Sequence, residues 1–208
     1  MEERKNITEY RRQLKQRILE YAYPAFATRG IRAVKMDDIA DELQISKRTL
    51  YEIYANKEEL LFEGLKAHQK EYDRKVKEYA GSSDRNVMEI VLYVLNYHMK
   101  ELGDTSAKFI ADLYRYPAIS EYFMKNKEEH RENFRKFLKR GVEEGYFRSD
   151  FNFDIMDTII NGIQQTVHTS DLYSIFPVKE VFYTMAQVIF RAICTSKGID
   201  ELEKFKLL

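Results

Sequence analysis

Residues 36–60 read MDDIADELQISKRTLYEIYANKEEL, and this stretch decides the fold of the leading part of the chain. An apolar face at helical spacing predicts a first short helix, with Met36, Ile39, Ala40 and Leu43 on that face. Ser46 is a good N-cap for a second short helix, and a capping-box pattern starts a third helix at Lys57. Helices of about two turns do not hold their shape alone, so these two must pack on flanking helices.

The outer side of the second short helix combines cations, a hydroxyl and a phenol, at Lys47, Arg48, Thr49 and Tyr51, with Lys57 just beyond. The dipole and the free N–H groups of a helix N-terminus favour phosphate. In the major groove, Lys and Arg can reach guanine O6 and N7. Basic residues alone would equally suit a solvated face beside a structural helix-turn-helix.

The order of these residues resembles the DNA-binding signature of the TetR family of transcriptional regulators. The matching groups are Ile39-Ala40, Ile45-Ser46-Lys47, Thr49-Leu50-Tyr51 and Lys57-Glu58-Glu59-Leu60. In detail the resemblance covers about residues 10–65; beyond them only the layout of helices is similar. It implies that Lys47, Arg48 and Thr49 approach base edges. It also implies phosphate contacts by Lys35, Ser46, Tyr51 and Lys57.

Three positions depart from the family pattern. Lys35 replaces the usual hydroxyl residue that caps the first short helix, and Ile53 stands where a polar residue is frequent. Gln44 replaces the usual turn glycine. A positive φ at Gln44 would cost roughly 1 kcal/mol. These departures affect a helix cap, a turn and one contact position, and they leave the DNA-binding function in place.

Composition and charge fit a DNA-binding protein without a membrane anchor. The chain has 208 residues and no net charge, yet residues 1–35 carry nine Lys or Arg and only four Glu. This positive leading end suits backbone phosphates. No apolar stretch reaches the roughly 18 residues of a membrane span, and the leading residues lack the apolar core of a signal peptide. With a single cysteine, Cys194, we expect a cytoplasmic protein.

The whole pattern predicts an all-α protein. A first helix runs through Pro24 to near Gly30, and further helices are expected near 84–101, 104–115, 118–144, 153–173 and 178–196. We predict a helix-turn-helix DNA-binding domain at 1–56, a connecting helix at 57–80, and a ligand-binding and dimerisation domain at 81–208.

The last two long helices are apolar on more than one side. A helix of this kind needs two neighbours, one in its own core and one elsewhere. A two-fold dimer would supply the second and would place two reading helices on a roughly palindromic operator, as in the family's layout. A thick monomeric core is the alternative. The expected interface residues are Ile155, Ile159, Ile163, Val181, Met185, Val188 and Ile189.

The second half also contains aromatic and large polar residues at positions expected to point inward. They are Tyr93, Tyr97, His98, Phe109, Tyr114, Phe123, Phe134, Gln164, His168 and Tyr183. The family resemblance implies an effector cavity here, and these side chains would suit a flat or apolar small molecule. Aromatic residues at helical spacing are equally the pattern of an ordinary core.

Sequence motifs for catalysis are missing: there is no His-Glu-x-x-His, no phosphate-binding glycine loop and no Gly-x-Ser-x-Gly. We therefore expect no enzyme, no cofactor and no metal. The resulting hypothesis is a ligand-responsive regulator, a repressor, that binds DNA as a homodimer and is released by a small-molecule effector. Two alternatives stay open: a DNA-binding regulator without an effector, and a helical small-molecule carrier without DNA binding.

Overall fold

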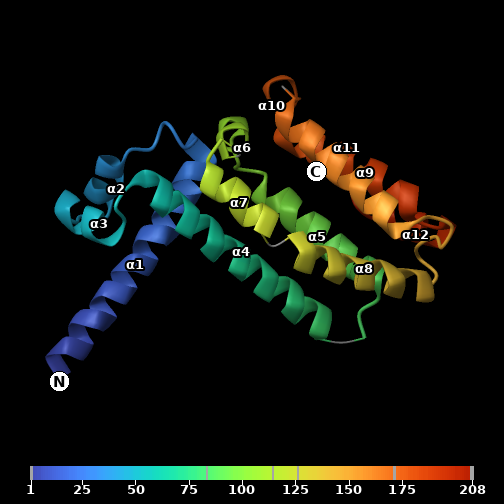
Figure 1. The fold of residues 1–208 in the computed structure, drawn as a ribbon, viewed down its shortest axis with the longest axis horizontal. Helices are drawn as coiled ribbons and strands as arrows, with labels where there is room; N and C mark the ends of the chain where they lie inside the picture. The colour runs from blue at the N-terminus through green and yellow to red at the C-terminus, as the bar shows by residue number, and fades with distance from the viewer. Residues whose placement is uncertain (1, 83, 114, 126, 171, 207–208) are drawn as a thin grey trace. The chain divides into compact units, whose positions relative to one another are not determined.

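The computed structural model describes residues 2–82, 84–113, 115–125, 127–170 and 172–206, and every named element among them is an α-helix (Figure 1). The all-α prediction is thus confirmed. The chain forms two compact units, Met1–Tyr72 and Asp73–Leu208. The division into three domains at residues 56 and 80 stays a prediction. No helix in the described ranges combines the length and the apolar character needed to cross a bilayer.

The first unit contains α1 (Glu2–Arg29), α2 (Met36–Glu42), α3 (Lys47–Ile53) and the first part of α4 (Lys57–Gly81). Side chains four residues apart on α1 form the stripe that the other helices cover, namely Leu14, Ile18, Ala22 and Phe26, each no more than 2% exposed. The opposing buried residues are Ile39, Ala40, Leu50, Tyr54, Leu60 and Leu61. This small core holds the two short helices in place.

The start of α4 is fixed by two capping hydrogen bonds. Asn56 Oδ1 accepts a hydrogen bond from Glu59 N at 2.8 Å, while Glu59 Oε2 accepts one from Ala55 N at 2.7 Å. The expected capping box is therefore present in a variant form, with its return bond one residue earlier.

The second unit contains the rest of α4 and eight further helices. They are α5 (Val87–Glu101), α6 (Ala107–Leu113), α7 (Pro117–Lys125), α8 (Lys127–Glu143), α9 (Phe153–Thr169), α10 (Leu172–Ile175), α11 (Val178–Ile193) and α12 (Ser196–Leu202). Helix α5 packs against α8, α11 and α12 around a shared apolar core. The single helix expected at 118–144 consists of α7 and α8, and the one expected at 153–173 ends at Thr169.

The segment after α8 is tied to the segment after α11. Phe147 and Cys194 form an isolated antiparallel bridge, Arg148 N donates to Ile193 O at 2.8 Å, and Thr195 N donates to Tyr146 O at 2.9 Å. Phe147 packs directly over Gly141, where a Cβ would lie only 2.0 Å from its ring. These contacts anchor the C-terminal helix to the core of the second unit.

Candidate DNA-binding surface

The turn between α2 and α3 is a Schellman motif centred on Gln44. The residue has φ 53°, Gln44 N donates to Asp41 O at 3.1 Å, and Ile45 N donates to Ala40 O at 3.0 Å. Both bonds satisfy carbonyls left free at the end of α2. The structure therefore confirms the positive φ expected at Gln44, in a position that glycine usually fills.

Helix α3 begins with a local hydroxyl cap. Ser46 Oγ accepts a hydrogen bond from Thr49 N at 3.0 Å and lies 2.8 Å from Thr49 Oγ1. Leu50 and Tyr54 are both 0% exposed and hold the inner side of the helix. The hydroxyls of Ser46 and Thr49, both predicted to face DNA, therefore bond to each other and cap α3 in the free protein. The longer side chains of α3 form its outer side.

The two cations on α3 each contact a carboxylate in the free protein. Lys47 Nζ lies 2.6 Å from Asp37 Oδ2, and Arg48 Nε lies 2.8 Å from Glu52 Oε1. The hydrogen bond that Lys47 donates to Asp37 raises the pKa of Lys47, and the one that Arg48 donates to Glu52 raises the pKa of Arg48. The Arg48 side chain is nevertheless 88% exposed and that of Lys47 is 58% exposed. Exposed pairs of this kind contribute little to stability and can be exchanged for other partners.

Tyr51 and Lys35 are also exposed. Tyr51 is 47% exposed on the outer side of α3. Lys35 is the N-cap of α2, and its backbone N–H donates to Asp38 Oδ2 at 3.2 Å. Because a lysine side chain has no acceptor, its ammonium takes no part in this cap. Both side chains are therefore accessible to phosphate.

Lys57 has a different role from the one expected. Its Nζ donates to Ile31 O at 3.0 Å and to Val34 O at 3.1 Å, so the ammonium joins the start of α4 to the segment between α1 and α2. The side chain is half-buried. We therefore infer a structural role for Lys57 in place of the phosphate contact predicted from the sequence.

Two further residues lie at the same surface: Arg11, one of the basic residues of the leading end expected to reach phosphates, and Glu52, which the sequence interpretation missed. Arg11 Nη2 donates to Glu52 O at 2.9 Å and so covers the C-terminal carbonyl end of α3. Glu52 was not singled out, although its i,i+4 spacing from Arg48 predicts the observed pair. The contact of Arg11 joins residues 41 apart and had no local signal.

The expected effector residues lie in several places in the second unit. An aromatic row on α4, α5 and α11 has ring-centroid distances of 4.0 Å (Tyr79–Tyr93), 6.5 Å (Tyr93–Tyr97), 5.9 Å (Tyr97–His98) and 5.6 Å (His98–Phe182). Phe109 is buried, and Tyr183 packs on Phe205 at 5.2 Å. The expectation that Gln164 points inward is wrong, since this residue is exposed. Tyr114 and the side chains of Phe123 and His168 lie outside the described residues.

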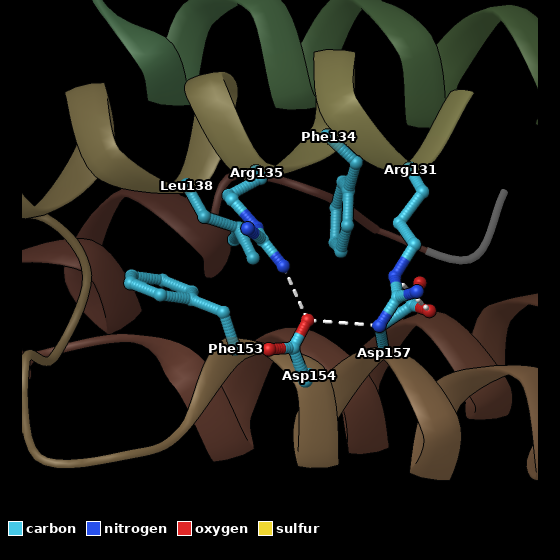
Figure 2. A pocket seen from close by; sticks show the side chains of 7 residues that line it. All are labelled: Arg131, Phe134, Arg135, Leu138, Phe153, Asp154 and Asp157. Atoms are coloured by element: carbon cyan, nitrogen blue, oxygen red, sulfur yellow. Dashed lines mark hydrogen bonds and ion pairs between the residues drawn. The ribbon is translucent and has the colours of Figure 1, made fainter. Parts of the chain in front are cut away.

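A small cavity between α8 and α9 is shown in Figure 2. It has a volume of about 10 Å³ and is lined by Arg131, Phe134, Arg135, Leu138, Phe153, Asp154 and Asp157. This is room for about one water molecule. Phe134 is the one predicted effector residue among its lining, and the cavity is far too small for a drug-sized ligand.

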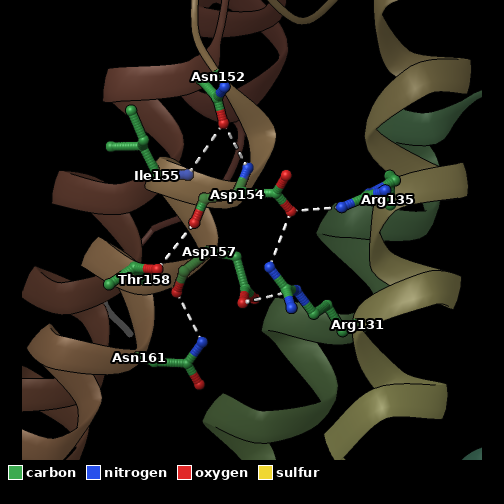
Figure 3. A network of polar contacts seen from close by, with 8 residues as sticks. All are labelled: Arg131, Arg135, Asn152, Asp154, Ile155, Asp157, Thr158 and Asn161. Carbon is green, nitrogen blue, oxygen red and sulfur yellow. Dashed lines mark hydrogen bonds and ion pairs between the residues drawn. The ribbon is translucent and has the colours of Figure 1, made fainter.

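Charged contacts join the two helices around this cavity (Figure 3). Arg131 Nη2 lies 2.8 Å from Asp154 Oδ1, Arg135 contacts the same oxygen, and Arg131 Nε lies 3.5 Å from Asp157 Oδ2. Asn152 Oδ1 accepts bonds from the first N–H groups of α9. The network fixes the start of α9 against α8.

Several apolar residues of α9 and α11 face solvent in the single chain. Ile155 is 61% exposed, Ile159 50% and Val188 56%. The expected interface residues Ile163, Met185 and Ile189 are half-buried. Val181 is 7% exposed and belongs to the core of its own chain, so its assignment to an interface is wrong.

Comparison with known proteins connects these features to a family. Residues 18–63 match the family model of bacterial regulatory proteins, tetR family. The chain is 29% identical over 144 residues to the HTH-type transcriptional repressor KstR2 of Mycobacterium tuberculosis, a match that covers 67% of this chain and 72% of that protein.

Two solved structures share the fold. The ketosteroid transcriptional regulator KstR2 of M. tuberculosis has a TM-score of 0.51 at 23% identity, covering 88% of this chain and 95% of that one. A transcriptional regulator from Saccharomonospora viridis, solved with choline, has a TM-score of 0.65 at 20% identity, covering 88% and 98%. The matched region contains α2, the Gln44 turn and the exposed side of α3. Residues 18–63 are therefore a region of the TetR-family type, and the chain shares the fold of these transcriptional regulators.

Proposed function

We propose that this protein is a ligand-responsive transcriptional repressor of the cytoplasm. It binds a roughly palindromic DNA operator as a homodimer and leaves it when a small-molecule effector binds. The observation that carries the proposal is the outer side of α3, where Lys47, Arg48 and Tyr51 are exposed over an inner side fixed by Leu50 and Tyr54.

In this proposal α3 enters the major groove. Arg48 is the best base-reading candidate, because its guanidinium is almost fully exposed and can donate two bonds to guanine O6 and N7. Lys47 approaches base edges, and Tyr51 and Lys35 contact phosphates. Thr49 can contribute its methyl group or exchange its bond with Ser46 for one to DNA.

The test is to capture genomic fragments with the purified protein, sequence them, and measure affinity for the recovered sites. Arg48→Ala should lower that affinity roughly 5- to 150-fold, the range for one bidentate base contact. Arg29→Ala is the matched control, because Arg29 is an exposed arginine of the same unit in the last turn of α1. Equal affinities for the wild type and Arg48→Ala would contradict the proposal.

The homodimer is supported by the exposed apolar residues of α9. Ile155, Ile159 and Gly162 fall on one side of this helix at spacings of four and three residues. A Cβ at Gly162 would meet nothing within 4 Å, so its own chain gives no packing reason for glycine. Glycine within a helix costs about 1 kcal/mol relative to alanine, whereas close approach of a second helix would explain it.

Light scattering after gel filtration tests the dimer. Ile159→Glu should shift the protein to monomer, and Gly162→Leu should weaken the dimer without disturbing the fold. Gln164→Glu is the matched control, because Gln164 is exposed on the opposite side of the same helix. A monomeric wild type, or a dimer that tolerates both changes, would contradict the proposal.

The effector is proposed to be a flat or apolar molecule that inserts beside the aromatic row of Tyr93, Tyr97 and His98. KstR2 is described as a ketosteroid regulator, so a fused-ring ketosteroid is a reasonable first probe. Binding would shift the equilibrium between two orientations of α4, a single helix that runs through both units. A coupling of about 1–3 kcal/mol between effector and DNA would be typical.

Thermal-shift screening tests this part. A ligand that binds the folded state raises the melting temperature and should also release the operator. The small cavity between α8 and α9 favours the second candidate, a DNA-binding regulator controlled without a small molecule. That candidate is supported if DNA binding is sequence-specific while fused-ring and flat aromatic compounds neither stabilise the protein nor release DNA.

A further inference from the structure

Glu52 places a negative charge on the side of α3 that is proposed to meet DNA. Its side chain is 57% exposed and lies on the same helical edge as Arg48. A carboxylate near a helix C-terminus is unfavourable with respect to the helix dipole, and beside DNA it would also face the phosphates. A role in solubility alone would therefore not explain a carboxylate at this position.

Two contacts hold Glu52 in place, one through its carboxylate and one through its backbone oxygen. Arg48 Nε donates to Glu52 Oε1 at 2.8 Å, so one carboxylate oxygen is engaged and the second is available as an acceptor. Arg11 Nη2 donates to the backbone oxygen of the same residue at 2.9 Å. This bond supplies positive charge to the C-terminal end of α3 and leaves the Glu52 side chain to Arg48.

The pair presents a donor group beside an acceptor group. Arginine donates to guanine O6 and N7, whereas a carboxylate accepts from an exocyclic amino group in the major groove. Cytosine N4 and adenine N6 are the two amino groups available there. Lys47 and Tyr51, the other long outward side chains of α3, offer an ammonium and a phenol, so neither provides this carboxylate chemistry.

We propose that Glu52 is a specificity-determining residue, which accepts a hydrogen bond from an exocyclic base amine next to the base contacted by Arg48. The inference rests on the proposed DNA-binding function and deepens it by stating what part of the operator contains. Each half-site then has a guanine for Arg48 and an adjacent cytosine or adenine for Glu52. The carboxylate also opposes binding to DNA that lacks this amine, because it stays close to the phosphates without a partner.

The experiment is selection from a library of random duplexes, followed by sequencing, with the full-length wild type, Glu52→Gln, Glu52→Ala and Arg48→Ala. Glutamine is isosteric but uncharged and pairs with adenine N6 and N7. Glu42→Gln is the matched control, since Glu42 is an exposed glutamate at the end of α2 in the same unit. Thermal unfolding of each variant checks that the fold is kept.

The expected result is a change at one position of the selected motif. Wild-type discrimination against bases without the amine should be roughly 5- to 150-fold and should disappear in Glu52→Ala. If the wild type selects cytosine at this position and Glu52→Gln selects adenine, cytosine is the natural partner of Glu52. If both proteins select adenine there, adenine is the natural partner. That position should adjoin the one lost in Arg48→Ala, and affinity for non-selected DNA should rise in both Glu52 variants.

Two results would overturn the inference and are distinguishable from each other. If both Glu52 variants select the wild-type motif and change affinity by the same factor as Glu42→Gln, the carboxylate is only a surface ion-pair partner. If the wild type selects no motif at all, the proposed function itself fails.

Discussion

Replacing Lys57 by methionine should destabilise the first unit without removing a DNA contact. The change keeps the alkyl chain but deletes the ammonium that donates to Ile31 O and Val34 O at 3.0 and 3.1 Å. A hydrogen bond to a charged group contributes about 1.5–3 kcal/mol, and water can replace part of both bonds at this half-buried site. We therefore expect a total loss of about 2–3 kcal/mol in the free energy of unfolding.

Urea denaturation combined with DNA binding at several salt concentrations tests this prediction. In a unit of this size, 1 kcal/mol corresponds to about 4–8 °C, so the melting temperature should fall by at least about 8 °C. The slope of log affinity against log salt should stay unchanged, because no phosphate contact is lost. Lys35→Met is the matched control, because Lys35 is exposed and is proposed to contact phosphate; it should behave in the opposite way, with an unchanged urea midpoint and a slope smaller by about 0.9.

The result that would refute this reasoning is a Lys57→Met protein with the wild-type urea midpoint and a reduced salt slope. Lys57 would then contact phosphate, as its sequence position predicted, and its bonds to the two carbonyls would be exchangeable. A fall in both quantities would mean that the ammonium serves the fold and DNA together.

Three further changes probe other features of the two units. Tyr54→Phe should be neutral or stabilising by up to about 1 kcal/mol in urea denaturation, because the buried Tyr54 hydroxyl has no hydrogen-bond partner among the described residues; a clear loss would reveal a partner. Gln44→Gly should raise the free energy of unfolding by up to about 1 kcal/mol, because glycine relieves the strain at φ 53°, although its larger unfolded-state entropy offsets part of the gain. Gln44→Val should be less stable than the wild type, because a β-branched residue is more strained at this φ. Burial raises the pKa of Cys194 to about 11, so iodoacetamide should label it at pH 8 only upon unfolding. The unfolded thiol releases its proton first, so the free energy of unfolding should fall between about pH 9 and 11 more steeply than in Cys194→Ala; parallel pH profiles would contradict this.

The DNA-binding unit could be predicted well because its signals are local. The apolar spacing of α2, the Ser46 cap and the turn at Gln44 each depend on residues within four or five positions of one another. The contacts of Lys57 with residues 31 and 34, and of Arg11 with residue 52, could not be predicted in the same way. They depend on how α1, α3 and α4 meet in space.

The second unit was harder to interpret because its helical spacing has more than one meaning. Aromatic residues spaced for one helix face are found equally in a core and in a cavity wall, so Tyr93 and Phe109 gave the same signal. The structure separates them, with Tyr93 stacked in a half-buried row and Phe109 buried. Val181 and Val188 likewise lie on one apolar helix, yet only Val188 is exposed in the single chain.

The two ion pairs on the DNA-binding surface suggest how the unit avoids indiscriminate binding. Lys47 is paired with Asp37 and Arg48 with Glu52, so these four side chains carry no net charge in the free protein. Had the pairs been buried, removing a partner would leave an unpaired buried charge, which is strongly destabilising. Because both are exposed, DNA can displace the carboxylates at little cost. The phosphates of random DNA would have to compete with these carboxylates for the two cations. A matching operator would instead bind the cations and Glu52 together. Discrimination between operator and random DNA should therefore increase with the number of these ion pairs that one site engages.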